Sequence, residues 1–229
     1  MQGPTASSAR SLHMTLHADL FFSFRSPYSY LSMGRYKAMV EEYDLDITLR
    51  TVWPIAIRDP DILFKGNPAA PRYIVMDSMR AAQFHGIPMA WPRPDPVVQN
   101  LMTREIAEDQ PHIYRIGRLG QAATRRGKGL LFAYEASKLI WDGSVDGWNE
   151  GDHLAGAADR AGLHLAELEA EAASDAAALD AEIAANQDAL EKAGHWGVPT
   201  LVFEGEPFFG QDRIEMAQWR MEQKGLAKR

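Results

Sequence analysis

A single serine stands between an apolar run and a helical pattern, at a position that suits the binding of an anion. The apolar run 20–24 has strand length and is rich in phenylalanine. It ends at Arg25, and Ser26 followed by Pro27 is a paired start signal for a helix. Backbone N–H groups at a helix N-terminus favour an anionic group such as a phosphate, a carboxylate or a thiolate. Ser26 therefore either only caps its helix or also binds a ligand.

The chain contains no cysteine. This excludes disulfides, thiolate metal sites and a cysteine nucleophile in the protein itself. Any thiol chemistry at Ser26 would have to come from a bound thiol. A serine nucleophile would need an adjacent base, which the neighbouring sequence does not supply. His85, His112 and His195 lack metal-ligand spacing, so we expect no metal.

The net charge of −7 argues against a general nucleic-acid binder, which would carry a basic face. A composition of 46% hydrophobic and 24% charged residues is ordinary for a soluble globular protein. Residues 1–15 lack the apolar core of a signal peptide, and no run approaches the roughly 20 apolar residues that a membrane helix needs. The sequence predicts a cytoplasmic protein that does not enter a membrane, with residues 1–16 as a mobile leader.

A strand–helix–strand unit occupies the beginning of the chain. The helix that starts at Pro27 is expected to continue to about Tyr43, since its apolar positions recur at helical spacing. Residues 47–53 then alternate between apolar and polar, which predicts a second strand. A crossover helix of this length implies that the strands 20–24 and 47–53 pair in parallel.

A long helical block separates this unit from the last strands, 200–203 and 207–209, which flank a tight turn and precede a helix starting near Gly210. This order predicts an α/β, thioredoxin-like fold (β-α-β … β-β-α) with a large all-helical domain inserted. We expect residues 17–58 and 195–229 to form the thioredoxin-like domain and 59–194 the inserted domain. Helices of the insertion are predicted over 72–84, 100–109, 114–126, 129–141, 154–161 and 165–193, the last broken near 174–175.

Four short segments have a distinctive order and spacing: Phe-Ser-Phe-Arg-Ser-Pro-Tyr-Ser-Tyr-Leu at 22–31, Gly-Asn-Pro at 66–68, Trp-Gly-Val-Pro-Thr at 196–200 and Phe-Gly-Gln-Asp-Arg at 209–213. They resemble the motifs of the 2-hydroxychromene-2-carboxylate isomerases. They are equally similar to those of the related kappa-class glutathione transferases of the thioredoxin superfamily. The resemblance covers residues 17–222.

The resemblance implies a glutathione site at Ser26. This serine stands where disulfide oxidoreductases of the superfamily carry their cysteine, and it would donate a hydrogen bond to the sulfur of glutathione. A hydroxyl together with a helix N-terminus lowers the pKa of a thiol. Pro199 would be cis, which would expose the Val198 backbone for pairing with a peptide-like ligand. The alternative for this segment is a plain structural turn.

The resemblance adds three polar residues to this site. Asp212 would accept from the ammonium of the γ-glutamyl group, while helix N-terminal amides bind the carboxylate of that group. Asp212 could equally be a helix cap. Asn67 would contact the substrate or glutathione, or it is an ordinary turn asparagine. Gln211 stands where the family often has a serine, which leaves the substrate open. Aromatic residues that could line a flat pocket, each otherwise a core residue, are Tyr28, Trp53, Phe64, Trp91 and Trp196.

The resemblance implies a glutathione-dependent isomerase that acts on a small aromatic, ring-fused hemiketal acid. In the family's chemistry, glutathione thiolate adds reversibly to a conjugated carbon, the ring opens, the adduct rotates and the thiolate leaves. A kappa-like transferase that conjugates glutathione to electrophiles is the second hypothesis. The third is a non-catalytic glutathione-binding, acid-binding or chaperone-like protein. A homodimer is expected, and the sequence leaves the natural substrate and the direction of the reaction open.

Overall fold

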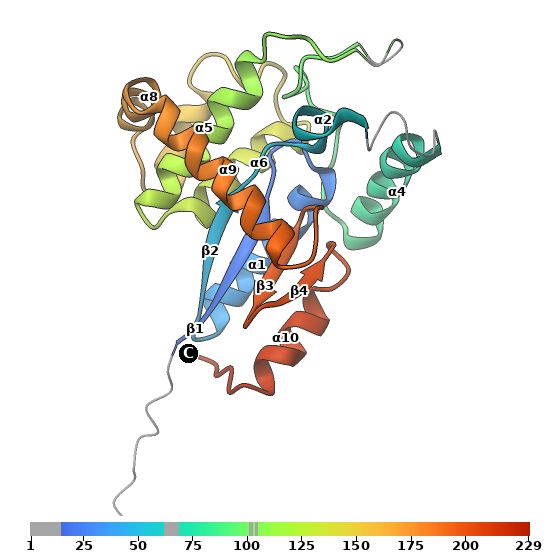
Figure 1. The fold of residues 1–229 in the computed structure, drawn as a ribbon, viewed down its shortest axis with the longest axis vertical. Helices are drawn as coiled ribbons and strands as arrows, with labels where there is room; N and C mark the ends of the chain where they lie inside the picture. The colour runs from blue at the N-terminus through green and yellow to red at the C-terminus, as the bar shows by residue number, and fades with distance from the viewer. Residues whose placement is uncertain (1–14, 62–68, 101–102, 104) are drawn as a thin grey trace, which may run out of the picture.

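The computed structural model describes residues 15–61, 69–100, 103 and 105–229. Its centre is a four-stranded sheet with the strand order β2-β1-β3-β4 (Figure 1). β1 (Leu16–Phe22) pairs in parallel with β2 (Leu45–Thr51) and antiparallel with β3 (Thr200–Phe203). β3 pairs antiparallel with the edge strand β4 (Glu206–Phe209). The parallel first pair and the C-terminal hairpin confirm the expected pairing of the first two strands and the expected order of elements along the chain.

Helices cover both faces of the sheet. α1 (Pro27–Glu42) connects β1 to β2 and contacts α10 (Ile214–Glu222), which also packs on β3 and β4. α9 (Ala176–Lys192) crosses the opposite face (Figure 1). Because strand side chains alternate between faces, Phe21 packs with Leu190 of α9, whereas its neighbours in β1 point into the main core. The middle of β1 is therefore buried on both sides.

The chain between β2 and β3 is a helical insertion, as expected. α5, α6 and α9 each contact β2, and one continuous apolar core extends from the sheet into these helices. The expected break near Ser174 is confirmed, since α8 ends there. The boundaries of the insertion at residues 59 and 194 stay a prediction. Its described helices are α2 (Ile55–Arg58), α4 (Ala69–His85), α5 (Pro111–Arg125), α6 (Gly129–Trp141), α7 (His153–Arg160), α8 (Leu165–Ser174) and α9.

The helix expected over 100–109 is wrong. Gln99 and Ile106 form an antiparallel bridge instead, so this part of the chain turns back on itself. The side chain of Asn100 accepts a hydrogen bond from the Thr103 N–H at 3.1 Å, which favours a turn over a helix. The buried Gln110 side chain donates to the Val98 carbonyl at 2.8 Å and accepts from its N–H at 2.9 Å. The Gln110 side chain thus joins the end of this segment to the backbone of Val98 before it.

The last helix begins at Ile214 and not near Gly210. Gly210 has a φ of +99°, in the left-handed region that glycine adopts without strain, and the chain turns there before α10 starts. Most of the expected leader and the segment 62–68, which contains Asn67 and Phe64, lie outside the described residues. No helix in the described part of the chain is both long and apolar enough to cross a bilayer.

We expect Gly120→Ala to destabilise the protein by roughly 1–3 kcal/mol. A Cβ at Gly120 in α5 would lie 2.6 Å from Cε2 of Phe24, whose ring is buried beside the β1–α1 turn. Gly34→Ala in α1 is the matched control, because its Cβ would meet nothing closer than 3.9 Å. The control should gain about 0.5–1 kcal/mol from helix propensity. Denaturant unfolding measures both, and equal stability of the two variants would contradict this packing.

Candidate functional site

Ser26 caps the N-terminus of α1. Its backbone is extended (φ −88°, ψ 119°), and its Oγ accepts a hydrogen bond from the Ser29 N–H at 3.2 Å. The first helical residue, Pro27, has no N–H to donate. The Tyr28 N–H has no hydrogen-bond partner among the described residues. The helix therefore presents one hydroxyl and one free amide at its N-terminus.

The structure brings Val198 and Pro199 to this serine across 172 positions of sequence. The Ser26 hydroxyl donates to the Val198 carbonyl at 3.3 Å. The peptide bond between Val198 and Pro199 is cis, as the resemblance implied. The Val198 N–H has no partner within the described residues. A strand-like backbone edge thus lies beside the serine hydroxyl.

The turn at 210–212 lies next to this edge. The Gly210 N–H donates to the Pro199 carbonyl at 2.8 Å. Asp212 is exposed, and its carboxylate accepts from the side chain of Arg213 at 2.6 Å. Asp212 does not cap α10, since the N-cap residue is Arg213 and its side chain makes no capping hydrogen bond. The helix-cap interpretation of Asp212 is therefore wrong.

Gln211 is connected to α1 by an arginine that the sequence did not single out. The Arg35 Nη2 group donates to the Gln211 side-chain oxygen at 2.6 Å and also to the Gln211 backbone carbonyl. Its only sequence signal is a basic position on the expected helix. Ser26, Val198, Pro199, Gln211 and Asp212 thus form a connected group around α1.

Tyr28 connects the start of α1 to α4. Its hydroxyl donates to the Asp77 carboxylate at 2.8 Å, and Tyr73 and Arg80 of α4 donate to the same carboxylate. Burial raises the pKa of Tyr28, and the hydrogen bond to Asp77 and the negative charges nearby, including that of Asp212, raise it further. Tyr28 therefore stays protonated, and its hydroxyl is committed to α4.

A second connection precedes Ser26 directly. The Arg25 guanidinium pairs with both carboxylate oxygens of Asp95, one of them at 2.7 Å, and the two side chains are only 14% and 19% exposed. The guanidinium lies 4.7 Å from the ring centre of Trp91. The Trp141 indole donates to the carbonyl of Phe24 at 2.9 Å. Sequence reasoning missed this clamp, because nothing local relates residue 95 to residue 25.

The tryptophans of the expected aromatic pocket each pack against a different neighbour. Trp53 packs edge-on against Tyr114 at 5.1 Å, and Trp91 packs edge-on against Trp141 at 5.4 Å. Trp196 stacks on His195 at 5.6 Å. These three side chains therefore have separate aromatic contacts.

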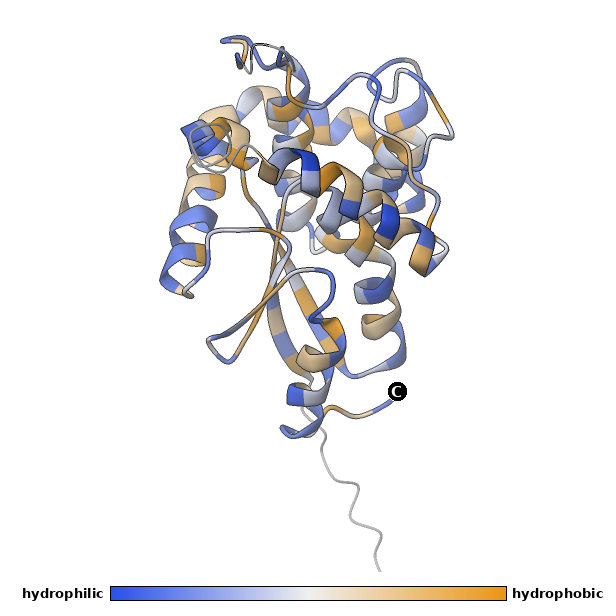
Figure 2. Cartoon of the chain, turned by 90° about the vertical axis from the view of Figure 1, so that its right-hand side faces the viewer, coloured by the Kyte–Doolittle hydropathy of each residue, from blue (hydrophilic) through white to orange (hydrophobic). Residues whose placement is uncertain are grey.

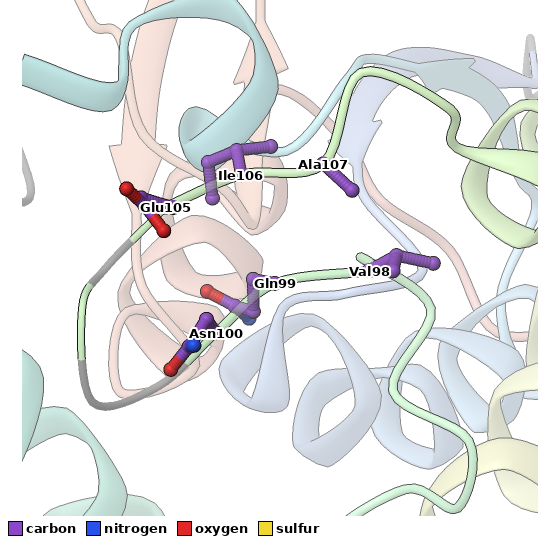
Figure 3. A pocket seen from close by; sticks show the side chains of 6 residues that line it. All are labelled: Val98, Gln99, Asn100, Glu105, Ile106 and Ala107. Carbon is purple, nitrogen blue, oxygen red and sulfur yellow. The ribbon is translucent and has the colours of Figure 1, made fainter.

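An open hollow of the described structure lies elsewhere. It has a volume of about 670 Å³ and is lined by the two arms of the 98–107 excursion (Figure 3). Among the described residues, Glu105 is its only ionisable lining residue, and no described residue of the expected site lines it. The chemistry of the candidate site therefore belongs to the N-terminus of α1 and not to this hollow.

The model of the DSBA-like thioredoxin domain matches residues 18–222, which is most of the chain. The protein belongs to the DSBA-like thioredoxin family. No curated protein matches this DSBA-like chain.

Solved structures with the same fold carry different names. A structure of 2-hydroxychromene-2-carboxylate isomerase is 20% identical, with a TM-score of 0.66 over 91% of this chain and 95% of the other. A probable DsbA oxidoreductase from Streptomyces coelicolor is 17% identical, with a TM-score of 0.59 and coverages of 91% and 89%. The cytosolic disulfide reductase DsbM from Pseudomonas aeruginosa is 17% identical, with a TM-score of 0.57 and coverages of 91% and 97%. At these identities the likeness shows the fold.

This family member lacks the residues for disulfide chemistry. A Cys-x-x-Cys pair is the redox motif of thioredoxin-like proteins, and a helix N-terminus lowers the pKa of its reactive thiol. Ser26 and Ser29 stand at that spacing at the start of α1, and the whole chain has no cysteine. The protein itself therefore cannot form a disulfide or attack one.

Asp95→Ala should destabilise the protein by roughly 3 kcal/mol, because it leaves the largely buried Arg25 cation without its partner. Asp146→Ala is the matched control. Asp146 pairs with Arg93 at 3.0 Å, but both side chains are 75% exposed, so the change should stay within about 0.5 kcal/mol. Chemical denaturation measures both, and a small effect of Asp95→Ala would show that the clamp does not stabilise the turn.

The stability of the protein should depend on pH through His195, which lies in the segment before Val198. Its Nδ1 accepts from the Gly197 N–H at 2.9 Å, and its ring stacks on Phe209 at 4.0 Å. Burial lowers the pKa of His195, so the unfolded chain binds the proton more readily. The free energy of unfolding should therefore fall as the pH drops through about 6.5. His195→Gln, whose amide oxygen can still accept, should reduce this loss in unfolding experiments between pH 5 and 8, and an unchanged profile would contradict the assignment.

Proposed function

We propose that this protein is a glutathione-dependent isomerase of aromatic compounds that resemble 2-hydroxychromene-2-carboxylate. One observation carries the proposal: a serine hydroxyl at a helix N-terminus faces a free strand edge before a cis proline, in a chain without cysteine. Such a site can stabilise a thiolate but cannot supply one. The 2-hydroxychromene-2-carboxylate isomerase fold and the solved complex of DsbM with GSH support this choice of reaction and ligand.

The residues of the site fit a peptide thiol. The Ser26 hydroxyl and the Tyr28 N–H are donors for a sulfur anion at the positive end of α1. The Val198 N–H and carbonyl can pair with the backbone of the cysteinyl residue in β fashion. Asp212 is exposed and can accept from the γ-glutamyl ammonium. The site thus offers complementary groups to the thiol, the cysteinyl backbone and the γ-glutamyl ammonium of glutathione.

The Ser26 hydroxyl has one proton, so it can donate to only one acceptor at a time. In the structure that acceptor is the Val198 carbonyl, at the long distance of 3.3 Å. When the hydroxyl donates to a ligand sulfur instead, the Val198 carbonyl becomes free to accept from a ligand N–H. Binding of a peptide thiol therefore exchanges one weak internal hydrogen bond for two hydrogen bonds to the ligand.

Glutathione, when bound, would supply a thiolate that adds reversibly to a conjugated carbon of the substrate, so that none is consumed. Ser26 and the first turn of α1 would hold the sulfur as an anion before the substrate arrives and after the product forms. Tyr28 does not act as the acid, because its proton is held toward Asp77. We place this activity in the cytoplasm, where thiols are kept reduced.

Ser26→Ala should lower kcat on the order of 100-fold and raise the pKa of the bound thiol, because a donor to the sulfur is removed. Thiolate absorbance against pH and turnover of a hydroxychromene carboxylate measure the two effects. Ser32→Ala is the control, since this buried serine of α1 donates only to the Ser29 carbonyl, at 2.7 Å. Unchanged turnover in Ser26→Ala would remove the role given to this serine.

The same assay distinguishes the alternatives. Isomerisation without loss of glutathione supports the proposal. Stoichiometric loss of glutathione into a conjugate would indicate a transferase similar to the kappa class. Absence of glutathione binding at millimolar concentration in calorimetry would exclude both enzymes and leave a non-catalytic acid-binding or chaperone-like protein.

A further inference from the structure

Arg35 is an unusual cation in the second half of α1. Its side chain is half-buried, and no carboxylate of the described residues forms an ion pair with it. Its Nε atom is buried without a hydrogen-bond partner. Burial lowers the pKa of Arg35, and the more distant charges of Glu215 and Asp212 partly offset this. Buried cations are normally paired, so this arginine has been placed at a cost in desolvation.

The hydrogen bonds that Arg35 makes to described residues all go to Gln211. Its Nη2 group donates to the backbone carbonyl and to the side-chain oxygen of Gln211. The turn that contains Gln211 has few other polar contacts: the Gly210 N–H donates to Pro199, and the Asp212 carboxylate pairs only with the adjacent Arg213 among the described residues. Among the described residues, Arg35 is therefore the one residue of α1 that donates a hydrogen bond to this turn.

The two ends of the candidate site are consequently both attached to α1. Ser26 at the N-terminus contacts Val198, and Arg35 contacts Gln211. A helix side chain leans toward the N-terminus of its helix, so the guanidinium lies closer to Ser26 than the spacing along the sequence suggests. An extended tripeptide spans about 10 Å, which makes the separation of these two ends critical for binding it.

Arg35 also decides which group Gln211 presents. Because the guanidinium can only donate, the Gln211 oxygen must face it, and the Nε2 amide group is turned away as a donor. A donor amide next to the Asp212 carboxylate suits a zwitterion: the amide would bind the carboxylate and Asp212 the ammonium. The α-amino acid head of a γ-glutamyl group has this chemistry.

We propose that Arg35 is a positioning residue that holds Gln211 and Asp212 in the geometry that recognises the γ-glutamyl head of the thiol. This inference rests on the proposed function, because it assumes that a glutathione-like thiol occupies the Ser26 site. Arg35 would act through Gln211 and would not touch the sulfur. Its loss should therefore weaken recognition of the γ-glutamyl group and leave the thiol end of the site intact.

Calorimetric titration with glutathione and with cysteinylglycine, which lacks the γ-glutamyl group, tests this role. The wild-type protein should prefer glutathione. Arg35→Met should bind glutathione roughly 10- to 100-fold more weakly, the cost of a lost hydrogen bond to a charged group. Its affinity for cysteinylglycine and the pKa of the bound thiol should not change. Arg35→Lys, which keeps the charge and one donor, should lie between the two.

Lys37→Met is the matched control. Lys37 lies in the same helix and pairs with Glu41, so both affinities should equal those of the wild type. Glutathione binding by Arg35→Met at wild-type strength would overturn the inference. So would an equal loss for both thiols in a variant with a wild-type melting temperature, because Arg35 would then support the whole site. If Arg35→Met does not fold, the ratio of the two affinities in Arg35→Lys decides, and an unchanged ratio counts against the role. If the wild-type protein binds neither thiol, the proposed function fails first, and this inference fails with it.

Discussion

The N-terminus of α1 is the constraint on which the rest of this structure depends. One hydroxyl, that of Ser26, accepts from the N–H of its own helix and donates to the carbonyl of Val198. The cap fixes where α1 starts, and the pairing of β3 with β1 places the segment before β3 beside it, where the weak second hydrogen bond forms. Because β1 delivers Ser26 and β3 follows Val198, the register of the central strands and the geometry of the site are coupled.

The helical insertion contributes directly to this arrangement. It supplies Asp95, which binds the guanidinium of Arg25, and Trp141, whose indole binds the carbonyl of Phe24. Both contacts attach the short segment between β1 and α1 to the insertion. A largely buried arginine would be costly without such a partner, so the turn and the insertion are stable together. α4, whose Asp77 accepts a hydrogen bond from Tyr28, lies on the side of the molecule that faces the viewer in Figure 2.

Membership of the DSBA-like thioredoxin family combines here with a complete absence of cysteine. A helix N-terminus that stabilises a thiolate is useful in disulfide exchange because the protein carries the thiol. With serine at that place, the same electric field can act only on a thiol that arrives as a ligand. In the proposed isomerase, the fold would keep its electrostatic feature while the sulfur would come from a ligand.

Much of the fold was predictable because its signals are local. Ser26 and Pro27 mark the start of α1, and the alternation over 47–53 marks β2, through the conformational preferences of adjacent residues. The order of these elements was sufficient for the thioredoxin-like topology and for the helical insertion. The family resemblance, and not these local signals, placed Ser26, Val198 and Pro199 in one site, and the structure brings the three together.

The remainder was decided by tertiary contacts. Residues 100–109 have helix-compatible composition, but the side chains of Asn100 and Gln110 bind backbone groups and hold an extended excursion instead. Arg25 finds Asp95 across 70 positions and Arg35 finds Gln211 across 176, although all of these are plain polar residues in the sequence. A local pattern determines backbone conformation through neighbouring residues. The partner of a charged or amide side chain is determined only once distant segments have packed, because hydrogen bonds require atoms within about 3 Å.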